Sequence, residues 1–185
     1  MHTTDPRKLL VKLAFVLDKL GLDYYITGGM AVSVWGRPRA TFDIDVVINL
    51  IEPQIKKLSS ALLKISKQGY INEEIAKEAL RTHGEFNFID PESGTKVDFW
   101  VAKMDEMANR EFMRRKSIRI ANQKVYFISP EDLIIRKLIW HKKTGSDRHI
   151  KDAESILKLS GKKLDTKYLK NWSDELKKAI KNKNS

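Results

Sequence analysis

Asp43 and Asp45 are the residues of this sequence whose types and spacing best suit chemistry. They stand in residues 41–48, whose alternation of apolar and other residues predicts a β-strand. Successive side chains of a strand leave opposite faces, so both carboxylates leave the same face. The side chains that leave the other face, and can bury in a core, are those of Phe42, Ile44, Val46 and Ile48. Adjacent carboxylates repel each other without a cation, and hard divalent metals prefer oxygen ligands, so the pair is a candidate metal site.

An exposed sheet face is the competing explanation for this pair. Two acids separated by one residue should arise by chance about twice in a chain of this length. Two further pairs fit that expectation: Asp90 and Glu92 fall in a predicted turn, and Asp152 and Glu154 fall in a predicted helix. Side chains two residues apart on a helix diverge, so only the pair at 43 and 45 shares a face beside a predicted core.

Two glycines and two arginines precede the aspartates. Gly28 and Gly29 follow a β-prone run, residues 24–27, and precede a short predicted helix. Such a step lets backbone N–H groups approach a phosphate closely, although a tight strand–helix turn explains it equally well. Arg37 and Arg39 could pair with a triphosphate or with the acids, and the alternative is that they are solvated loop residues.

Asp98 is a third candidate, because it is the one acid in the predicted strand 96–102. An isolated acid in an apolar strand is paired with a cation, exposed at a sheet edge, or a ligand. With two candidate ligands already present, we interpret Asp98 as a third ligand.

Composition limits the class of protein. The chain has 185 residues, of which 42% are hydrophobic and 32% charged, as expected for one globular domain or a domain with a small helical appendage. It has no Cys, which excludes disulfides, thiolate metal sites and Cys nucleophiles and is compatible with the cytoplasm. No apolar run approaches the roughly 18 residues of a membrane helix, and no signal peptide is predicted. The formal net charge of +11 favours anionic partners, although a Lys-rich solvated surface explains it too.

The elements that must position these residues are mostly strands in the first two-thirds and helices in the last third. We predict helices at 6–20, 30–35, 52–66, 72–82 and 104–115, strands at 24–27, 41–48, 85–89, 96–102, 117–120 and 125–128, and helices from 130 onward with breaks at Gly145 and Gly161. Asp5 and Pro6 suit the start of the first helix, and Gly21 suits its end. This order predicts an α/β core that carries a C-terminal helical segment.

In combination, these residues resemble the DNA polymerase β-type nucleotidyltransferase superfamily. The resemblance rests on Gly-Gly, a gap of 13 residues, Asp-x-Asp on a strand, and a later strand Asp. The wording Gly-Gly-Met-Ala-Val…Arg-x-Thr-x-Asp-Ile-Asp-Val-Val-Ile in residues 28–48 is most similar to the AbiEii-like and minimal nucleotidyltransferase branches. Residues 129–138 and 148–152, with Glu-Asp-Leu…Lys…Arg-x-x-Lys-Asp, are similar to helical motifs of AbiEii-like proteins. Residues 50–95 and 160–185 match no motif.

The resemblance implies a fold and a set of site residues. The fold would be α/β (α+β): a mixed sheet flanked by helices in residues 1–128, with a helical segment, 129–185, packed on that core. The metal ligands and catalytic residues would be Asp43, Asp45 and Asp98, holding two Mg²⁺ ions or, alternatively, Mn²⁺. The residues that would bind a nucleoside triphosphate such as ATP are Gly28, Gly29, Arg39, Lys137 and Asp152. Lys137 would touch phosphate and Asp152 would orient the acceptor, whereas a surface lysine and an ion-paired helix acid are the ordinary alternatives.

The function that the resemblance implies is Mg²⁺-dependent transfer of a nucleoside monophosphate from a triphosphate to an acceptor, with release of pyrophosphate. The acceptor stays open: a small molecule, a protein side chain or RNA. One alternative is a non-catalytic nucleotide- or RNA-binding module of the same fold. Another is a toxin that an antitoxin-type partner neutralises.

Overall fold

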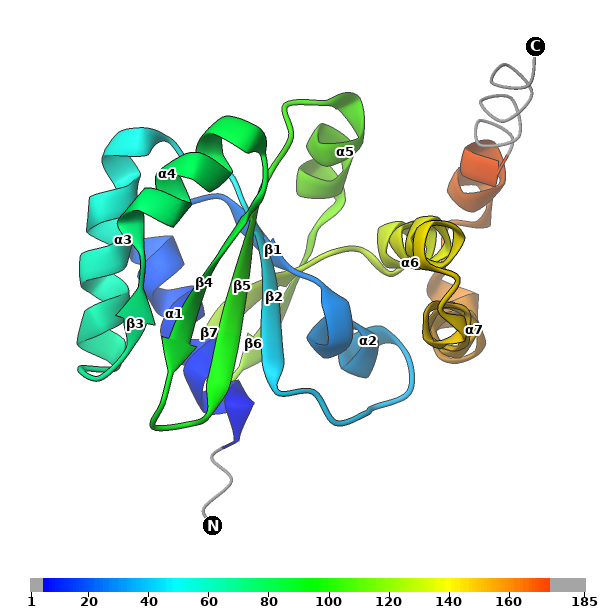
Figure 1. Cartoon of the computed structure of the whole chain (residues 1–185). Helices are drawn as coiled ribbons and strands as arrows, with labels where there is room; N and C mark the ends of the chain where they lie inside the picture. The colour runs from blue at the N-terminus through cyan, green and yellow to red at the C-terminus, as the bar shows by residue number, and fades with distance from the viewer. Residues whose placement is uncertain (1–4, 174–185) are drawn as a thin grey trace. The chain divides into compact units, whose positions relative to one another are not determined.

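A seven-stranded mixed sheet occupies the N-terminal two-thirds of the chain in the computed structural model, which describes residues 5–173 (Figure 1). The strands are β1 (Tyr24–Ile26), β2 (Asp43–Ile48), β3 (Tyr70–Ile71), β4 (Glu85–Asp90), β5 (Thr95–Val101), β6 (Lys116–Ile120) and β7 (Gln123–Phe127). Their order across the sheet is β3-β4-β5-β2-β1-β7-β6. β2 pairs with β5, and β1 with β7, in parallel, and the other neighbours are antiparallel. The sheet therefore places β2 beside β5, although about fifty residues of chain separate them.

The helices are α1 (Pro6–Lys19), α2 (Gly28–Trp35), α3 (Glu52–Ile65), α4 (Glu73–Thr82), α5 (Glu106–Arg114), α6 (Pro130–Thr144) and α7 (Asp147–Ser160), followed by a 3₁₀ turn (Gly161–Lys163) and helical residues 166–173. Asp5 and Ser129 cap the starts of α1 and α6, as predicted. The Asp5 side chain accepts a hydrogen bond from the Arg7 amide at 3.0 Å, and the Ser129 side chain accepts one from the Asp132 amide at 3.1 Å. Each bond satisfies an amide that has no partner within its own helix. No helix among residues 5–173 is both long and apolar enough to span a membrane.

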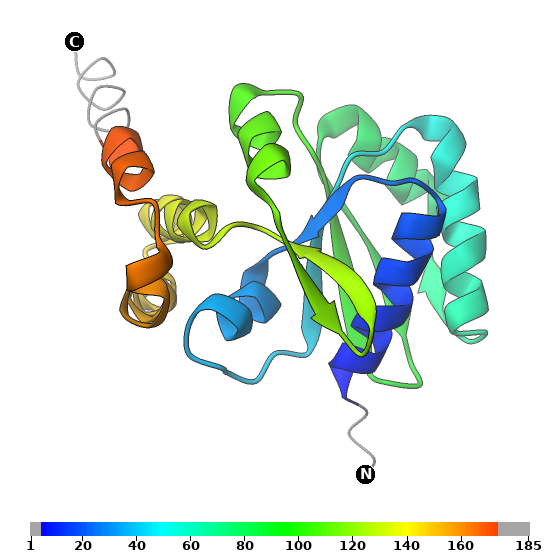
Figure 2. The same cartoon turned by 180° about the vertical axis from the view of Figure 1, so that it is seen from behind.

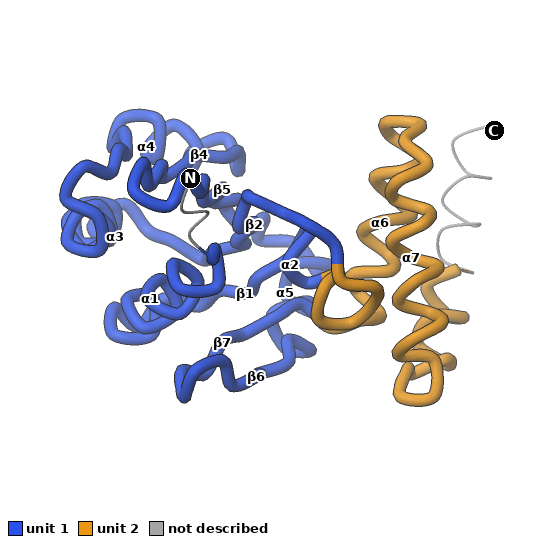
Figure 3. The backbone as a smooth tube through the Cα atoms, turned by 90° about the horizontal axis from the view of Figure 1, so that it is seen from below, with its two compact units in different colours: residues 1–31, 39–128 blue, residues 32–38, 129–185 orange. Residues whose placement is uncertain are grey.

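The core lies between one face of the sheet and the helices α1, α3 and α4 (Figure 3). In β2, every second residue, Ile44, Val46 and Ile48, has no exposed surface. Leu13 and Leu17 of α1 are equally buried. The residues between the apolar ones in β2 face the other side of the sheet, where α5 lies (Figure 3). The core thus leaves the aspartates of β2 on the face opposite α1 and α3.

The structure departs from the sequence prediction at Phe42, at the start of α2 and at β3. Phe42 was expected in the core but is 66% exposed, because β2 begins only at Asp43 and the alternation of the strand does not extend to it. The short helix was expected from Met30 but begins at Gly28, so both glycines belong to its first turn. β3 was not predicted, since two residues carry no periodicity and pair only through β4.

The residues form two units, which are described separately: residues 1–31 with 39–128, and residues 32–38 with 129–185 (Figure 3). In the second unit, α7 holds residues 32–38: the Ser160 hydroxyl donates to the Trp35 carbonyl at 2.6 Å, and the Arg37 amide donates to Ser155 Oγ at 3.3 Å. A Cβ on Gly36 would lie 3.0 Å from Ile156 Cγ1, so the two segments are in close contact. The predicted division at residue 128, with the helical segment packed on the core, stays a prediction, and its end, residues 174–185, lies outside the described residues.

Candidate active site

The three predicted aspartates share one face of the sheet. Asp45 lies directly opposite Asp98 in the parallel pairing of β2 with β5, and Asp43 is two residues before Asp45. Residues opposite each other in such a pair point to the same side, as do residues two apart. Asp43 is exposed, Asp45 is half-buried, and the Asp98 side chain is 15% exposed. We name these three residues the acidic face.

Lys96 adds a positive charge to the acidic face. It lies opposite Asp43 in the strand pairing, and its Nζ is 2.9 Å from Asp98 Oδ2. Its hydrogen bond to Asp98 raises the pKa of the Lys96 ammonium, and the negative charges of Asp98, Asp43 and Glu85 raise it further, while partial burial opposes them. Lys96 was not among the predicted site residues. The signal was present, because a lysine two residues before a candidate ligand on a strand shares that ligand's face.

Gly28 lies against Asp45. The φ angle of Gly28 is +59°, a backbone conformation that residues other than glycine rarely adopt. A Cβ on Gly28 would also lie 2.5 Å from Asp45 Cγ and overlap the carboxylate. The Thr27 amide donates to the Asp45 carbonyl at 2.9 Å and fixes the turn from β1 beside β2. The first turn of α2 therefore approaches the acidic face at a distance that only glycine permits.

Gly29 brings the loop before β2 to the same turn. A Cβ there would lie 2.8 Å from Thr41 Oγ1 and 3.3 Å from Arg39 Nη1. The Thr41 hydroxyl also donates to the Asp43 carbonyl at 3.2 Å. Gly28 therefore contacts Asp45, Gly29 lies beside Arg39 and Thr41, and Asp98 is opposite Asp45, while the role of these residues as a site stays a prediction. The backbone amide of Arg37, in contrast, is bonded to Ser155 in the second unit.

Solved structures with a similar fold are nucleotidyltransferases. ANT(2'')-Ia in complex with adenylyl-2''-tobramycin matches with a TM-score of 0.64 and 15% identity over 96% of this chain and 99% of that chain. A nucleotidyltransferase-like protein from Paracoccidioides brasiliensis matches with a TM-score of 0.57 and 26% identity over 83% and 75% of the two chains. The lincosamide adenylyltransferase LnuA, bound to lincomycin, matches with a TM-score of 0.55 and 14% identity over 84% and 98%.

The chain has the nucleotidyltransferase fold. This confirms the predicted fold class, a mixed sheet flanked by helices with helices at the C-terminal end. No family model matches the sequence, and the search of curated proteins found no match. The sequence identities to these solved structures are low and establish the fold alone, so the assignment to the AbiEii-like branch stays a prediction.

The donor set of this nucleotidyltransferase-fold chain suits a hard divalent ion, since carboxylate oxygens are the ligands that Mg²⁺ and Mn²⁺ prefer. Within the described part of the chain, however, no group of three or more His, Asp or Glu residues is arranged to hold a metal. Asp98 is instead paired with the Lys96 ammonium. The chemistry of the residues fits the ion, and Lys96 occupies the charge position that a cation would take beside Asp98.

Lys137 and Asp152 form a buried ion pair in the second unit. Lys137 Nζ of α6 is 2.8 Å from Asp152 Oδ2 of α7, and the side chains are 9% and 6% exposed. His149, also on α7, has a pKa lowered first by burial and then by the charge of Lys137, while Asp152 opposes the shift. Its Nδ1 is buried and has no hydrogen-bond partner among residues 5–173. Contact of Lys137 and Asp152 with a nucleotide stays a prediction.

Proposed function

We propose that the protein is a nucleotidyltransferase that depends on Mg²⁺ or Mn²⁺ and moves a nucleoside monophosphate from a triphosphate such as ATP to an acceptor. The observation that carries the proposal is the contact between the glycine turn and the acidic face: a Cβ on Gly28 would overlap the Asp45 carboxylate, with Asp98 opposite Asp45. A binding module that does no chemistry has no use for three carboxylates on one face beside such a turn.

The residues have distinct roles in this proposal. Asp43, Asp45 and Asp98 would hold two divalent ions, which supply the positive charge that a triphosphate and its leaving group require. The amides of Gly28 and Gly29, at the start of α2, would donate to phosphate oxygens, and Arg39 would pair with the same phosphates. An acceptor hydroxyl or amine attacks the α-phosphorus, the bond to the bridging oxygen breaks, and pyrophosphate leaves. We assign Asp98 to accept the proton of the acceptor.

Lys137 and Asp152 are proposed as contributors from the second unit, Lys137 toward phosphate and Asp152 toward the acceptor. Each is the other's partner in the buried pair, so a phosphate that binds Lys137 must replace Asp152 as its counter-ion. This exchange would link nucleotide binding to release of the Asp152 carboxylate.

The acceptor that we propose to test first is a small molecule that bears hydroxyl groups. ANT(2'')-Ia and LnuA, which share the fold over most of their length, were solved with adenylyl-tobramycin and with lincomycin. RNA and protein side chains are the further acceptors to test. A toxin neutralised by an antitoxin-type partner would be a biological role of the same chemistry rather than another reaction.

The deciding experiment is transfer of label from the four α-³²P nucleoside triphosphates, with Mg²⁺ or Mn²⁺, to panels of small molecules, RNA and protein. Label on an acceptor, absent from the Asp45→Asn variant and present in an Asp147→Asn control, supports the proposal. Asp147 is exposed in the first turn of α7, in the other unit. Nucleotide binding without transfer to any acceptor, unchanged in Asp45→Asn, would favour the non-catalytic binding module.

A further inference from the structure

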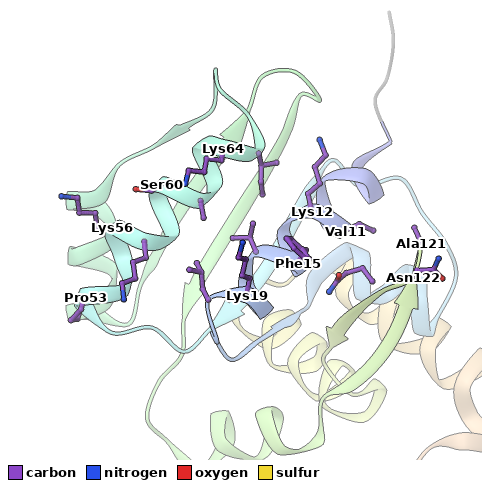
Figure 4. A pocket seen from close by; sticks show the side chains of 16 residues that line it. Val11, Lys12, Phe15, Lys19, Pro53, Lys56, Ser60, Lys64, Ala121 and Asn122 are labelled. Atoms are coloured by element: carbon purple, nitrogen blue, oxygen red, sulfur yellow. The ribbon is translucent and has the colours of Figure 1, made fainter.

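A groove of about 1230 Å³ lies in the first unit between α1, α3 and the turn of the β6–β7 hairpin (Figure 4). α1 runs beside the hairpin, as the view from behind shows (Figure 2). The helices α1 and α3, which line the groove, cover one face of the sheet, and α5 lies over the other face (Figure 3). The acidic face is on the side of β2 opposite its buried residues, which face α1 and α3. A ligand in this groove therefore binds a surface separate from the candidate active site.

The rim of the groove is positive. Five lysines line it: Lys12, Lys19, Lys56, Lys57 and Lys64. All five are exposed, and none of their ammonium groups has an ion pair or hydrogen bond among the described residues. No acidic residue lines the groove. Several like charges around one hollow raise its potential and favour a ligand that carries negative charge.

The floor of the groove is apolar. It is formed by Val11, Phe15, Val16, Leu20, Pro53, Ala61 and Ile65, with Ala121 at the hairpin end. Phe15 is 56% exposed, although Leu17, two residues later in the same helix, is fully buried. Exposed apolar patches and apolar hollows are typical of surfaces that bind another molecule, and this groove combines the two around Phe15.

The rows of side chains along the groove have helical spacing. On α3, Pro53, Lys57, Ala61 and Ile65 are four residues apart, as are Lys56, Ser60 and Lys64. On α1, Val11 and Phe15 repeat in the same way, as do Val16 and the C-cap residue Leu20. The row on α3 runs for about 18 Å, which is the length of roughly three helical turns. The groove therefore has the length and the ridges to receive one further helix.

We propose that this groove binds an amphipathic α-helix of a partner protein, with an apolar stripe that covers Phe15 and with Asp or Glu residues that meet the lysine rim. The apolar stripe would follow the i, i+3, i+4, i+7 pattern of a helix that lies in a groove. Burial of Phe15 supplies the affinity, and the five lysines select an acidic partner and speed its association.

Other occupants fit the groove less well. Single-stranded RNA is bound by stacking of its bases on aromatic rings and by positive side chains that follow its backbone, and this groove has one aromatic ring and an aliphatic floor. The end of this chain, residues 174–185, carries four lysines and two acids, so its charge does not complement the rim. A second copy carries the same net charge of +11.

The test is a selection of helical peptides of about 18 residues, displayed as a random library, on the intact chain. We expect the selected peptides to be acidic and amphipathic, and their binding to weaken as salt rises. In the variant Phe15→Glu, and separately in the variant Lys12→Glu/Lys19→Glu/Lys57→Glu, the dissociation constant should rise roughly tenfold or more. All four positions are exposed, so the folded structure should persist, which circular dichroism checks.

The matched control is Lys8→Glu/Lys67→Glu/Lys103→Glu, which also reverses three exposed charges of the first unit, all outside the groove. Its dissociation constants should stay within about threefold of the parent chain. Selected peptides that lack acidic residues, or that bind the groove variants as well as the control, would overturn the proposal. So would binding of a labelled single-stranded RNA, or self-association of the chain, if either is lost in Phe15→Glu while no peptide is selected.

Discussion

Gly28 packs so closely against the Asp45 carboxylate that no residue with a side chain fits at position 28. A Cβ on Gly28 would lie 2.5 Å from Asp45 Cγ, and the φ of +59° adds a second requirement for glycine. The residue that would bring backbone amides to a phosphate is thus in contact with a residue that would hold a metal ion. The phosphates of the nucleotide and the divalent ion would then bind side by side, so that their opposite charges neutralise each other.

Comparison of Gly28→Ala with Gly21→Ala separates the two reasons for glycine at position 28, which are its backbone conformation and its contact with Asp45. Gly21 has a φ of +64° and no atom within 4 Å of a Cβ placed on it, so Gly21→Ala measures backbone strain alone. We expect Gly21→Ala to lower the free energy of unfolding by about 1–2 kcal/mol. Gly28→Ala should lower it by about 1–3 kcal/mol more, because Asp45 must move. Denaturant unfolding measures both, and the excess should disappear in an Asp45→Ala background. An excess that persists there would show that Asp45 is not the cause.

Nucleotide binding should require the divalent ion, because three carboxylates repel a triphosphate unless a cation lies between them. A ligand at a hundredfold excess over its dissociation constant stabilises the folded state by about 2.7 kcal/mol. For a chain of this size, that raises the melting temperature by roughly 5–10 °C. We expect this rise with nucleotide plus Mg²⁺, little with nucleotide alone, and none in Asp43→Asn. Equal rises with and without Mg²⁺ would point to phosphates held by basic residues away from the acids.

Lys96 should compete with the divalent ion for the acidic face. Its ammonium is 2.9 Å from Asp98, so binding of an ion there has to displace it. Lys96→Met removes the competitor, and we expect the affinity for Mn²⁺ in the absence of nucleotide to rise roughly fivefold. Isothermal titration of Mn²⁺ measures this, with Lys103→Met, an exposed lysine just after β5, as control. A weaker affinity in Lys96→Met would show that the lysine orders the carboxylates instead.

The Lys137–Asp152 pair should respond to single and double substitution differently. Removing one member leaves an uncompensated buried charge, so Lys137→Met or Asp152→Leu should lower the free energy of unfolding by about 3–5 kcal/mol. The double variant Lys137→Met/Asp152→Leu should recover most of that loss. If the double variant is stable but transfers no label, the pair serves the reaction. If it is stable and fully active, the pair serves only the packing of α6 against α7.

His149 should make the protein less stable in mild acid. Burial and the charge of Lys137 lower its pKa below the usual 6.5, so the unfolded chain takes up a proton first as the pH falls. Stability is therefore lost from about pH 6.5 down to the lowered pKa of the folded state. We expect His149→Gln to flatten this part of the profile of melting temperature against pH. An NMR titration of His149 with its midpoint above 6.5 would contradict the prediction.

The strand phase of Asp43 and Asp45 is an example of what sequence alone can determine. Alternation along β2 is local, because two residues of one strand share a face whatever that strand pairs with. The starts of α1 and α6 were predictable for the same reason, because Asp5 and Ser129 cap them, whereas the start of α2 was not. The turn predicted around residues 90–92 is present but begins after β4, which ends at Asp90, and the Asp90 side chain accepts from the Glu92 amide at 3.2 Å.

The tertiary structure decided which residues meet. Nothing local places Asp98 opposite Asp45, because β5 reaches β2 through pairing across about fifty residues. The sequence identified Asp98 as a candidate ligand, from its place in an apolar strand and from the family resemblance, but not its register with Asp45. The same pairing brought Lys96 to the acidic face, and the start of β2 at Asp43 left Phe42 outside the strand and exposed. The lysine-rimmed groove has no local signature, since its rows come from α1 and α3, which become neighbours only when both cover the sheet. A sequence sets periodicity along one element, whereas register and adjacency between elements follow from the packing of the whole core.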